Sequence, residues 1–377
     1  MKVMLVFGTR PEIIKVDPVI KELEKRKIQA VLVHTGQHNL DSLLADLKIR
    51  KPDYVLDLPP ESAGKFKGGL ASGIVKAAKW SFVIAQQIRK ITKTEKPDVL
   101  LYQGDTLAIA SASIAGRLVS RRPVLGHIEA GLRTHELFNP FPEEISRVIA
   151  DKASDLLFAA TEESANNLKK ECQIHGKIIL TGNTIVDAIL IHKKLAEKAR
   201  VKLPKKYLVV FIHRQENVHT KETITNIFQF IKGVKEKVIF LEHPTLMQKI
   251  HDFGLEKELN SLKNIKAVPF YDYLEFMKVM KNSLCMVTDS GGLQEETCVL
   301  KVPCIVWRKN TERMEAVRAG SAVLVGNDYK LALKYVGEIQ QKKGFYKKAM
   351  SAKNPFGDGK SAKKIVDACI KEISAKK

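Results

Sequence analysis

Residues 3–15, VMLVFGTRPEIIK, contain the pattern on which the predicted fold rests. An apolar, valine-rich run (Val3–Phe7) is followed by Gly8, and Pro11 stands where a first helical turn would begin. Short runs of this kind favour strands, and proline is well tolerated in the first turn of a helix. The stretch therefore predicts a strand that leads directly into a helix.

Short apolar runs alternate with helical stretches along the rest of the chain, in two series separated by a lysine-rich link at 198–206. The expected strands of the first series are 3–7, 30–34, 54–58, 99–102, 124–128, 156–159 and 178–180. Those of the second series are 207–212, 238–241, 265–268, 285–287, 304–306 and 322–324. Such alternation predicts parallel sheets with helices on both faces. The expected fold class is therefore α/β, with two doubly wound domains divided near residue 185.

The composition is that of a globular enzyme, with 45% hydrophobic and 28% charged residues, and 377 residues suffice for two domains of ordinary size. Lysine and arginine (63) outnumber aspartate and glutamate (42), which gives a net charge of +21. No basic stretch is interleaved with aromatic residues that could stack on bases. A solvated lysine surface is therefore favoured over a nucleic-acid partner.

The five cysteines are an odd, scattered set without a C-x-x-C pair. This usage argues against a disulfide framework or a zinc site and favours a reducing compartment. The first residues lead straight into a strand, so no signal peptide is expected. No apolar run approaches the ~20 residues of a membrane helix. We therefore expect a cytoplasmic protein that has no membrane partner.

Ligands of open parallel sheets bind beyond the carboxyl ends of strands, where helix N-termini present backbone N–H groups. Gly8-Thr9-Arg10-Pro11-Glu12 occupies one such strand end, and Lys15 follows about one turn later. The segment predicts an anion site, and a plain turn with surface charges is the alternative. It lacks the G-x-G-x-x-G fingerprint of dinucleotide binding.

A second strand end, Thr288 to Glu296, places Ser290-Gly291-Gly292 at the start of a helix. Its N–H groups and hydroxyl would face a phosphate, and the helix dipole would add attraction. Glu296 lies about one turn further, where it could accept hydrogen bonds from ribose hydroxyls. The alternative is a capped helix with acidic residues in its first turn.

Polar residues follow further strands. Asp105, in Gly104-Asp105-Thr106, could be catalytic or only a helix cap. Glu129 ends an apolar strand, where a carboxylate without a purpose would be costly. His127 is expected to be a hydrogen-bonded core histidine, whereas His213 could be buried or could face a phosphate. His135-Glu136 begins like the H-E-x-x-H zinc motif, but Asn139 replaces its second histidine, so no metal is expected.

Together these segments resemble the non-hydrolysing UDP-N-acetylglucosamine 2-epimerases, in the same order over nearly the whole chain. The matching segments are Gly8–Glu12 with Lys15, Gly36–His38, Gly104–Thr106, His127–Thr134, Pro142–Glu144 with Arg147, Gly182–Thr184, His213-Arg214, Thr288–Glu296, Thr311–Arg313 and Asn354–Gly359. Gln103, Ile212 and Tyr271 depart from residues common in that family.

The resemblance implies a glycosyltransferase-B fold, in which two Rossmann-like domains enclose the active site in the cleft between them. The first domain would span residues 1–185 and be joined by the C-terminal helix, 360–377. Residues 186–359 would form the UDP-binding domain. It further implies a homodimer that acts on a UDP-sugar without a metal or nicotinamide cofactor.

The resemblance also assigns roles to individual residues. UDP would be bound by Arg10, His213, Ser290, Gly291, Gly292 and Glu296, with Phe276 against the uracil. Asp105, Glu129 and Glu143 would line the sugar, with Lys15, Arg147 and Arg313 nearby. Asp105, Glu129, Glu143 and His213 would be the catalytic residues.

The expected reaction interconverts UDP-N-acetylglucosamine and UDP-N-acetylmannosamine. Carbon 2 of the sugar has no adjacent carbonyl, so its proton becomes acidic only after the anomeric C–O bond breaks and UDP departs. Cations and helix N-termini would stabilise the departing pyrophosphate, and carboxylates on two faces of the ring would move the proton. The alternatives are an epimerase of a related 2,3-diacetamido uronic acid sugar and a glycosyltransferase of the same fold.

Overall fold

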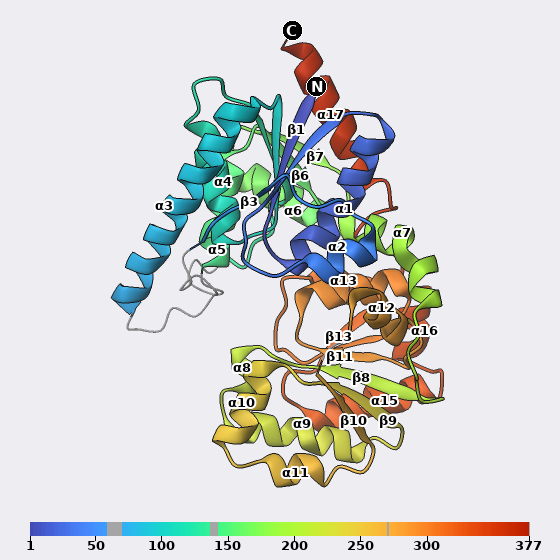
Figure 1. Ribbon diagram of the computed structural model, residues 1–377. Coiled ribbons are helices and arrows are strands. Elements are labelled where there is room, and N and C mark those ends of the chain that lie inside the picture. Colours follow the sequence, from blue (N-terminus) through green and yellow to red (C-terminus); the bar gives the residue numbers. More distant parts are fainter. Residues whose placement is uncertain (59–69, 136–141, 270, 377) are drawn as a thin grey trace. The chain divides into compact units, whose positions relative to one another are not determined.

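The computed structural model describes residues 1–58, 70–135, 142–269 and 271–376. The chain forms two compact units, one made of Met1–Leu190 and Phe356–Lys377 and the other of Ile191–Pro355. In each unit helices alternate with strands, and all the paired strands run parallel (Figure 1). The predicted fold class, α/β with two doubly wound parallel sheets, is confirmed.

The first unit contains a seven-stranded sheet in the order β3-β2-β1-β4-β5-β6-β7. Its strands are β1 (Lys2–Phe7), β2 (Gln29–His34), β3 (Tyr54–Val55), β4 (Val99–Gln103), β5 (Val124–Ala130), β6 (Leu156–Ala159) and β7 (Lys177–Leu180). Its helices are α1 (Arg10–Lys25), α2 (Asp41–Leu47), α3 (Leu70–Glu95), α4 (Leu107–Arg117), α5 (Glu143–Ala153), α6 (Glu162–Lys170), α7 (Thr184–Lys198), which runs on into the second unit, and α17 (Ser361–Ala375).

The second unit contains a six-stranded sheet in the order β10-β9-β8-β11-β12-β13. Its strands are β8 (Tyr207–Phe211), β9 (Lys237–Leu241), β10 (Ile265–Val268), β11 (Met286–Thr288), β12 (Cys304–Val306) and β13 (Ala322–Leu324). Its helices are α8 (Gln215–Val218), α9 (Lys221–Gly233), α10 (Pro244–Asp252), α11 (Glu256–Asn260), α12 (Tyr273–Lys281), α13 (Gly291–Leu300), α14 (Met314–Arg318), α15 (Tyr329–Gln340) and α16 (Phe345–Ser351).

Each sheet reverses its strand order once, between β1 and β4 in the first unit and between β8 and β11 in the second. Ligands of doubly wound folds bind outside the carboxyl ends of the strands at such a reversal. Gly8 and Gly104 follow β1 and β4, and His213 and Ser290 lie just beyond β8 and β11. The topology therefore places the polar strand ends singled out in the sequence at the expected ligand edge of each sheet.

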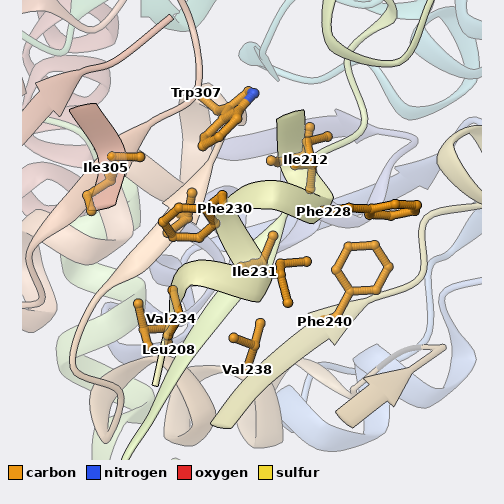
Figure 2. Close-up of a cluster of buried hydrophobic side chains, with 14 of the residues drawn as sticks. Leu208, Ile212, Phe228, Phe230, Ile231, Val234, Val238, Phe240, Ile305 and Trp307 are labelled. Atoms are coloured by element: carbon orange, nitrogen blue, oxygen red, sulfur yellow. The ribbon is translucent and has the colours of Figure 1, made fainter. Parts of the chain in front are cut away.

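Apolar side chains cover both faces of each sheet, and the strands are therefore continuous hydrophobic runs in the sequence. Figure 2 shows part of one such layer, in which α9 packs on the strands of the second unit. Phe230 and Trp307 meet there edge to face, with ring centroids 5.5 Å apart. Trp307 is fully buried, and its indole N–H donates to Asn327 Oδ1 at 2.6 Å.

The last helix of the chain, α17, packs against α1 in the first unit. Arg26 at the end of α1 pairs with Asp367 on α17 at 2.6 Å. Asp187, in the first turn of α7, accepts hydrogen bonds from the N–H groups of Ser361 and Ala362 at 3.2 and 3.0 Å. Within the described ranges, no helix combines the length and apolarity that crossing a bilayer requires.

Candidate functional site

The loop after β1 is shaped by a capping box at the start of α1. Thr9 is the N-cap and accepts from the N–H of Glu12, and Glu12 Oε2 accepts from the N–H groups of Gly8 and Thr9 at 2.6 and 3.1 Å. Burial raises the pKa of Glu12 to about 7, against the lowering effect of these hydrogen bonds. The Thr-x-x-Glu spacing could have identified this role from the sequence, because it is the capping-box signature.

The carboxylate of Glu129 is held in place by two neighbouring side chains. Lys15 Nζ lies 2.8 and 2.6 Å from its two oxygens, and Gln103 Nε2 donates to Oε2 at 2.6 Å. The carboxylate is largely shielded, with 10% of its side chain exposed. The structure thus joins Lys15 to Glu129, two residues predicted separately, and adds Gln103, which the sequence marked only as a departure from the family pattern.

The backbone of Glu129 is strained, with φ at +70° where a side chain is disfavoured. The β5–β6 register shifts at this residue, between Ile128 and Ala130, as in a β-bulge. Strained residues of this kind persist only where the surroundings hold them, and they gather at functional sites. The bulge turns the Glu129 side chain out of the strand alternation and toward Lys15.

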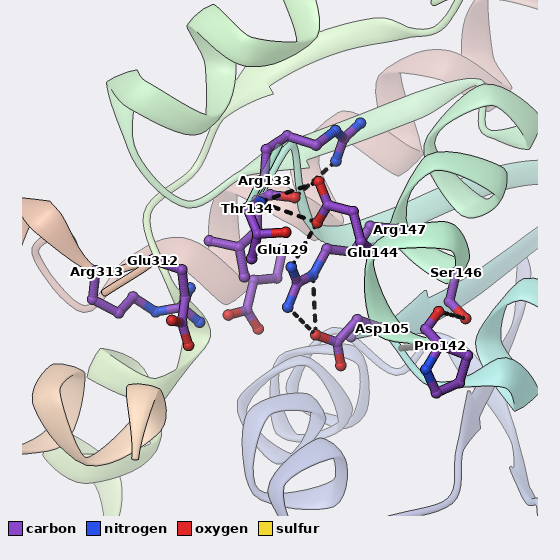
Figure 3. A network of polar contacts seen from close by, with 12 residues as sticks. Asp105, Glu129, Arg133, Thr134, Pro142, Glu144, Ser146, Arg147, Glu312 and Arg313 are labelled. Carbon is purple, nitrogen blue, oxygen red and sulfur yellow. Dashed lines mark hydrogen bonds and ion pairs between the residues drawn. The ribbon is translucent and has the colours of Figure 1, made fainter. Parts of the chain in front are cut away.

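Asp105 follows Gly104, whose φ of +93° gives a sharp turn after β4. Arg147 Nη2 and Nε lie 2.6 and 3.1 Å from Asp105 Oδ2, and Arg147 Nη1 lies 2.8 Å from Glu144 (Figure 3). Asp105 remains 34% exposed on its side chain and is accessible to a ligand. Predicted Glu143 begins α5, one turn before Arg147, so a single helix supplies both residues.

The prediction for His127 is confirmed. This residue is 1% exposed, and its two ring nitrogens lie 2.6 Å from Asp151 Oδ1 and 2.8 Å from the carbonyl oxygen of Gly104. It is a hydrogen-bonded core histidine, as expected. Asp151, its partner on α5, was not singled out by sequence reasoning, because an acidic residue inside an amphipathic helix gives no local signal of burial.

In the second unit, Ser290 is the N-cap of α13 and makes no side-chain cap of its own. A Cβ added at Gly291 would lie 2.5 Å from Glu312 Oε1, whereas one at Gly292 would meet nothing within 4 Å. A side chain at Gly291 would therefore have to displace the Glu312 carboxylate, which is paired with Arg214 and Arg308, whereas a Cβ at Gly292 would stand in open space. Backbone N–H groups at such a helix start suit an anionic oxygen.

His213 and Asp289 form a pair at the reversal point of the second sheet. His213 Nδ1 lies 3.1 Å from Asp289 Oδ1, and the backbone N–H groups of His213 and Arg214 also donate to the Asp289 carboxylate. Burial would raise the pKa of Asp289, but the contacts with His213, Asn217 and Arg214 hold it below its usual range. Asp289 thus fixes His213, which stays 28% exposed and stacks on Phe211.

Arginine–carboxylate contacts surround the start of α13 and the loop that precedes α14. Glu312 lies 3.0 Å from Arg214 and 2.6 Å from Arg308. Burial opposes ionisation of Glu312, but the neighbouring arginines lower its pKa to about 2. Arg308 also reaches Glu216, and predicted Arg313 pairs with buried Glu295. The sequence identified Arg313 but not its partner.

The remaining predicted residues occupy helix starts and helix faces. Arg10 is the first residue of α1, and its charge contributes, after burial, to holding the pKa of His38 below its usual range. Glu296 lies within α13, and Phe276 is a half-buried side chain of α12 packed near Tyr271. Glu136 and Asn139, named for the incomplete zinc motif, lie outside the described residues.

Comparison with known proteins shows the family of the whole chain. A family model described as UDP-N-acetylglucosamine 2-epimerase matches residues 21–370. The UDP-N-acetylglucosamine 2-epimerase of Methanocaldococcus jannaschii is 39% identical, covering 97% of this chain and 98% of its own. That of Methanococcus maripaludis is 37% identical, covering 98% and 99%.

Solved structures agree with the sequence relatives. The M. jannaschii enzyme in complex with UDP-GlcNAc and UDP has a TM-score of 0.80 at 36% identity, covering 98% of this chain and all of its own. The Neisseria meningitidis UDP-GlcNAc 2-epimerase bound to UDP-GlcNAc has a TM-score of 0.82 at 33% identity, with 98% and 100% coverage. The chain therefore belongs to the UDP-N-acetylglucosamine 2-epimerase family.

Proposed function

We propose that this chain is an isomerase that interconverts UDP-N-acetylglucosamine and UDP-N-acetylmannosamine by eliminating and re-adding UDP. One structural observation carries the proposal: the strained bulge at Glu129 holds a shielded carboxylate against Lys15 and Gln103 at the ligand edge of the first sheet. A carboxylate held at a fixed position in this way is placed to act as an acid/base group. Family membership supplies the substrate on which such a base acts.

The reaction needs UDP to leave before the carbon 2 proton moves. The electron pair of the anomeric C–O bond departs with UDP, the carbon 2 proton passes to a carboxylate, and a 1,2-double bond results. UDP then re-adds at carbon 1 while a proton reaches carbon 2 from the opposite face. Donors aimed at the leaving pyrophosphate stabilise the charge that develops there.

The nucleotide is bound through the predicted residues of the second unit together with Arg10. His213 and the α13 start (Ser290, Gly291 and Gly292) hold the pyrophosphate, Glu296 the ribose, and Phe276 the uracil. The location of these residues at the strand-order reversal supports the assignment. The second unit is accordingly the UDP-binding domain, and the first carries the groups that move the proton.

Proton transfer is assigned to Asp105, Glu129 and Glu143, and His213 acts as a catalytic residue at the leaving group. Lys15 and Arg147 hold Glu129 and Asp105 respectively, as their ion pairs support. Arg313 is assigned to substrate binding on the family resemblance, and within the second unit it pairs with Glu295. We further propose a cytoplasmic homodimer, on the composition and on the family resemblance.

Proton NMR of the protein with UDP-N-acetylglucosamine in D₂O tests the proposal. The manno isomer should accumulate without any acceptor, and deuterium should enter carbon 2 of both isomers. A glycosyltransferase would leave the nucleotide sugar unchanged until an acceptor is added. Product without deuterium would exclude elimination, and no product at all would refute the function.

A further inference from the structure

The two ring nitrogens of His127 both face atoms that can only accept a hydrogen bond. Nδ1 lies 2.6 Å from Asp151 Oδ1, and Nε2 lies 2.8 Å from the carbonyl oxygen of Gly104. A neutral imidazole carries one N–H and would leave one of these contacts without a proton. Because the ring is 1% exposed, no solvent can replace the missing donor. The geometry therefore calls for the imidazolium form, in which both nitrogens donate.

The charges around His127 balance this positive ring. Asp151 Oδ2 lies 2.7 Å from Arg133 Nη2 and accepts from the N–H of Gly131 at 3.1 Å. Arg133 in turn forms a two-point pair with Glu171, with Nη2 2.9 Å from Oε2. Two cations (His127 and Arg133) thus meet two anions (buried Asp151 and partly exposed Glu171), so the cluster is neutral overall. A buried charge is tolerated when it is paired and hydrogen-bonded in this way.

Other groups that pack against His127 do not alter this balance. The ring of Tyr102 on β4 lies 5.5 Å away, tilted by 37°, and its hydroxyl is hydrogen-bonded to Ser154. Burial raises the pKa of Tyr102, so its hydroxyl stays neutral. Burial would also raise the pKa of Asp151, but His127 and Arg133 hold it below its usual range. Independently of His127, the Arg133 guanidinium, which is always charged, lies 2.7 Å from Asp151 Oδ2 and favours the ionised carboxylate.

This cluster joins the segments that carry the proposed catalytic carboxylates. The Gly104 carbonyl that accepts from His127 belongs to the residue directly before Asp105. The Gly131 N–H that donates to Asp151 lies two residues after Glu129, on the far side of the bulge. Gly104 and Gly131 have positive φ, at +93° and +81°, so each stands at a sharp turn next to a proposed catalytic residue, and His127 and Asp151 contact the backbone of these two turns.

Asp151 also fixes the helix that carries the rest of the site. Glu143, Arg147 and Asp151 are spaced four residues apart on α5 and therefore lie along one face of the helix. From this face Arg147 forms an ion pair with Asp105 (Figure 3). Asp151 connects the same face to β5 through its contact with His127. The position of α5 relative to β4 and β5 is thus set by buried ionic contacts as well as by apolar packing.

We propose that Asp151 and the imidazolium form of His127 are positioning residues for the epimerase reaction, which hold Asp105 and Glu129 at a fixed separation. The inference rests on the proposed function but concerns residues that do not touch substrate. Displacement of a catalytic group by about 1 Å can cost about 100-fold in rate, so loss of this link should affect turnover more than binding.

The kinetic test compares Asp151→Asn and His127→Gln with a matched control, Tyr102→Phe. The control removes a buried polar contact beside the same ring but leaves the link between Asp151 and Gly104 intact. We expect the first two variants to lower kcat by about 10- to 100-fold with KM changed by less than about 3-fold. Tyr102→Phe should stay within about 2-fold, and calorimetry should give the same Kd for UDP in all folded variants. Equal losses in the control, or unchanged kcat in both variants, would overturn the inference.

A second measurement uses the wild-type chain and does not depend on any variant folding. With ¹⁵N-labelled histidine, one ring should show two N–H protons that are both protected from solvent exchange at pH 7.5. The absence of such a ring would show that His127 is neutral and would refute the proposal. If the wild type failed to epimerise its substrate but showed this ring, the proposed function would fail while the ionic link would stand.

Discussion

The replacement Glu12→Gln should change how the stability of the first unit depends on pH. Glu12 is 3% exposed, and burial raises its pKa to about 7 from an ordinary value of 4.5. A glutamine oxygen can accept the same hydrogen bonds from Gly8 and Thr9 that Glu12 Oε2 accepts. The variant therefore removes ionisation at this position and preserves the capping box.

The sign of the change in stability with pH follows from the direction in which the pKa of Glu12 is shifted. The folded state holds the Glu12 proton to higher pH than the unfolded state, so this group's contribution to stability is fully present below pH 4.5 and is lost as pH rises through 7. Between pH 5 and pH 8.5 the loss amounts to about 2.5 kcal/mol for these two values, at 1.36 kcal/mol for each unit of pKa difference. Glutamine at this position suffers no such loss.

The assay must report on the first unit alone. The chain has two tryptophans, Trp80 in the first unit and Trp307 in the second. In a Trp307→Phe background, urea unfolding followed by Trp80 fluorescence gives the free energy of unfolding for the unit that contains Glu12. Glu24, exposed on the same helix, provides the control replacement Glu24→Gln.

We expect the free energy of unfolding of Glu12→Gln, relative to the parent, to rise by about 2.5 kcal/mol between pH 5 and pH 8.5. The difference for Glu24→Gln should remain flat. Other titrating groups cancel in these differences, because they are common to both chains of each comparison. A pH-independent difference for Glu12→Gln would show that Glu12 ionises at its ordinary pKa, and the burial argument would be wrong.

Three further predictions concern the proposed site. Gly291→Ala should lower the free energy of unfolding by about 1–3 kcal/mol, because its Cβ would meet Glu312. Gly292→Ala should leave the free energy of unfolding unchanged or raise it by up to about 1 kcal/mol. Urea unfolding measures both changes. Glu129→Gln should lower kcat by at least about 100-fold in the NMR assay, and near-normal turnover would remove it from the mechanism. Asp289→Asn should weaken UDP binding at least about 10-fold in calorimetry, because the carboxylate that fixes His213 loses its charge; an unchanged Kd would dismiss that role.

Much of the fold was predictable because its signals are local. Apolar runs such as Val3–Phe7, followed by Gly8 and the Pro11 turn, identify strands and helix starts without any tertiary information. The alternation of these elements restricts the chain to parallel sheets, and the family motifs bring candidate residues such as Glu129 and Ser290 to strand ends. The sequence by itself therefore determined the fold class, the family and the candidate residues.

The partners of those residues were decided only by tertiary structure, because they are far apart along the chain. Lys15 meets Glu129 across 114 residues, and His213 meets Asp289 across 76. Nothing local distinguishes Asp151, on α5, or Glu312, in the loop before α14, from the exposed acidic residues of the chain. Burial and ion pairing set the protonation of Glu12, Asp289 and Glu312, and both depend on which segments the sheets bring together in space.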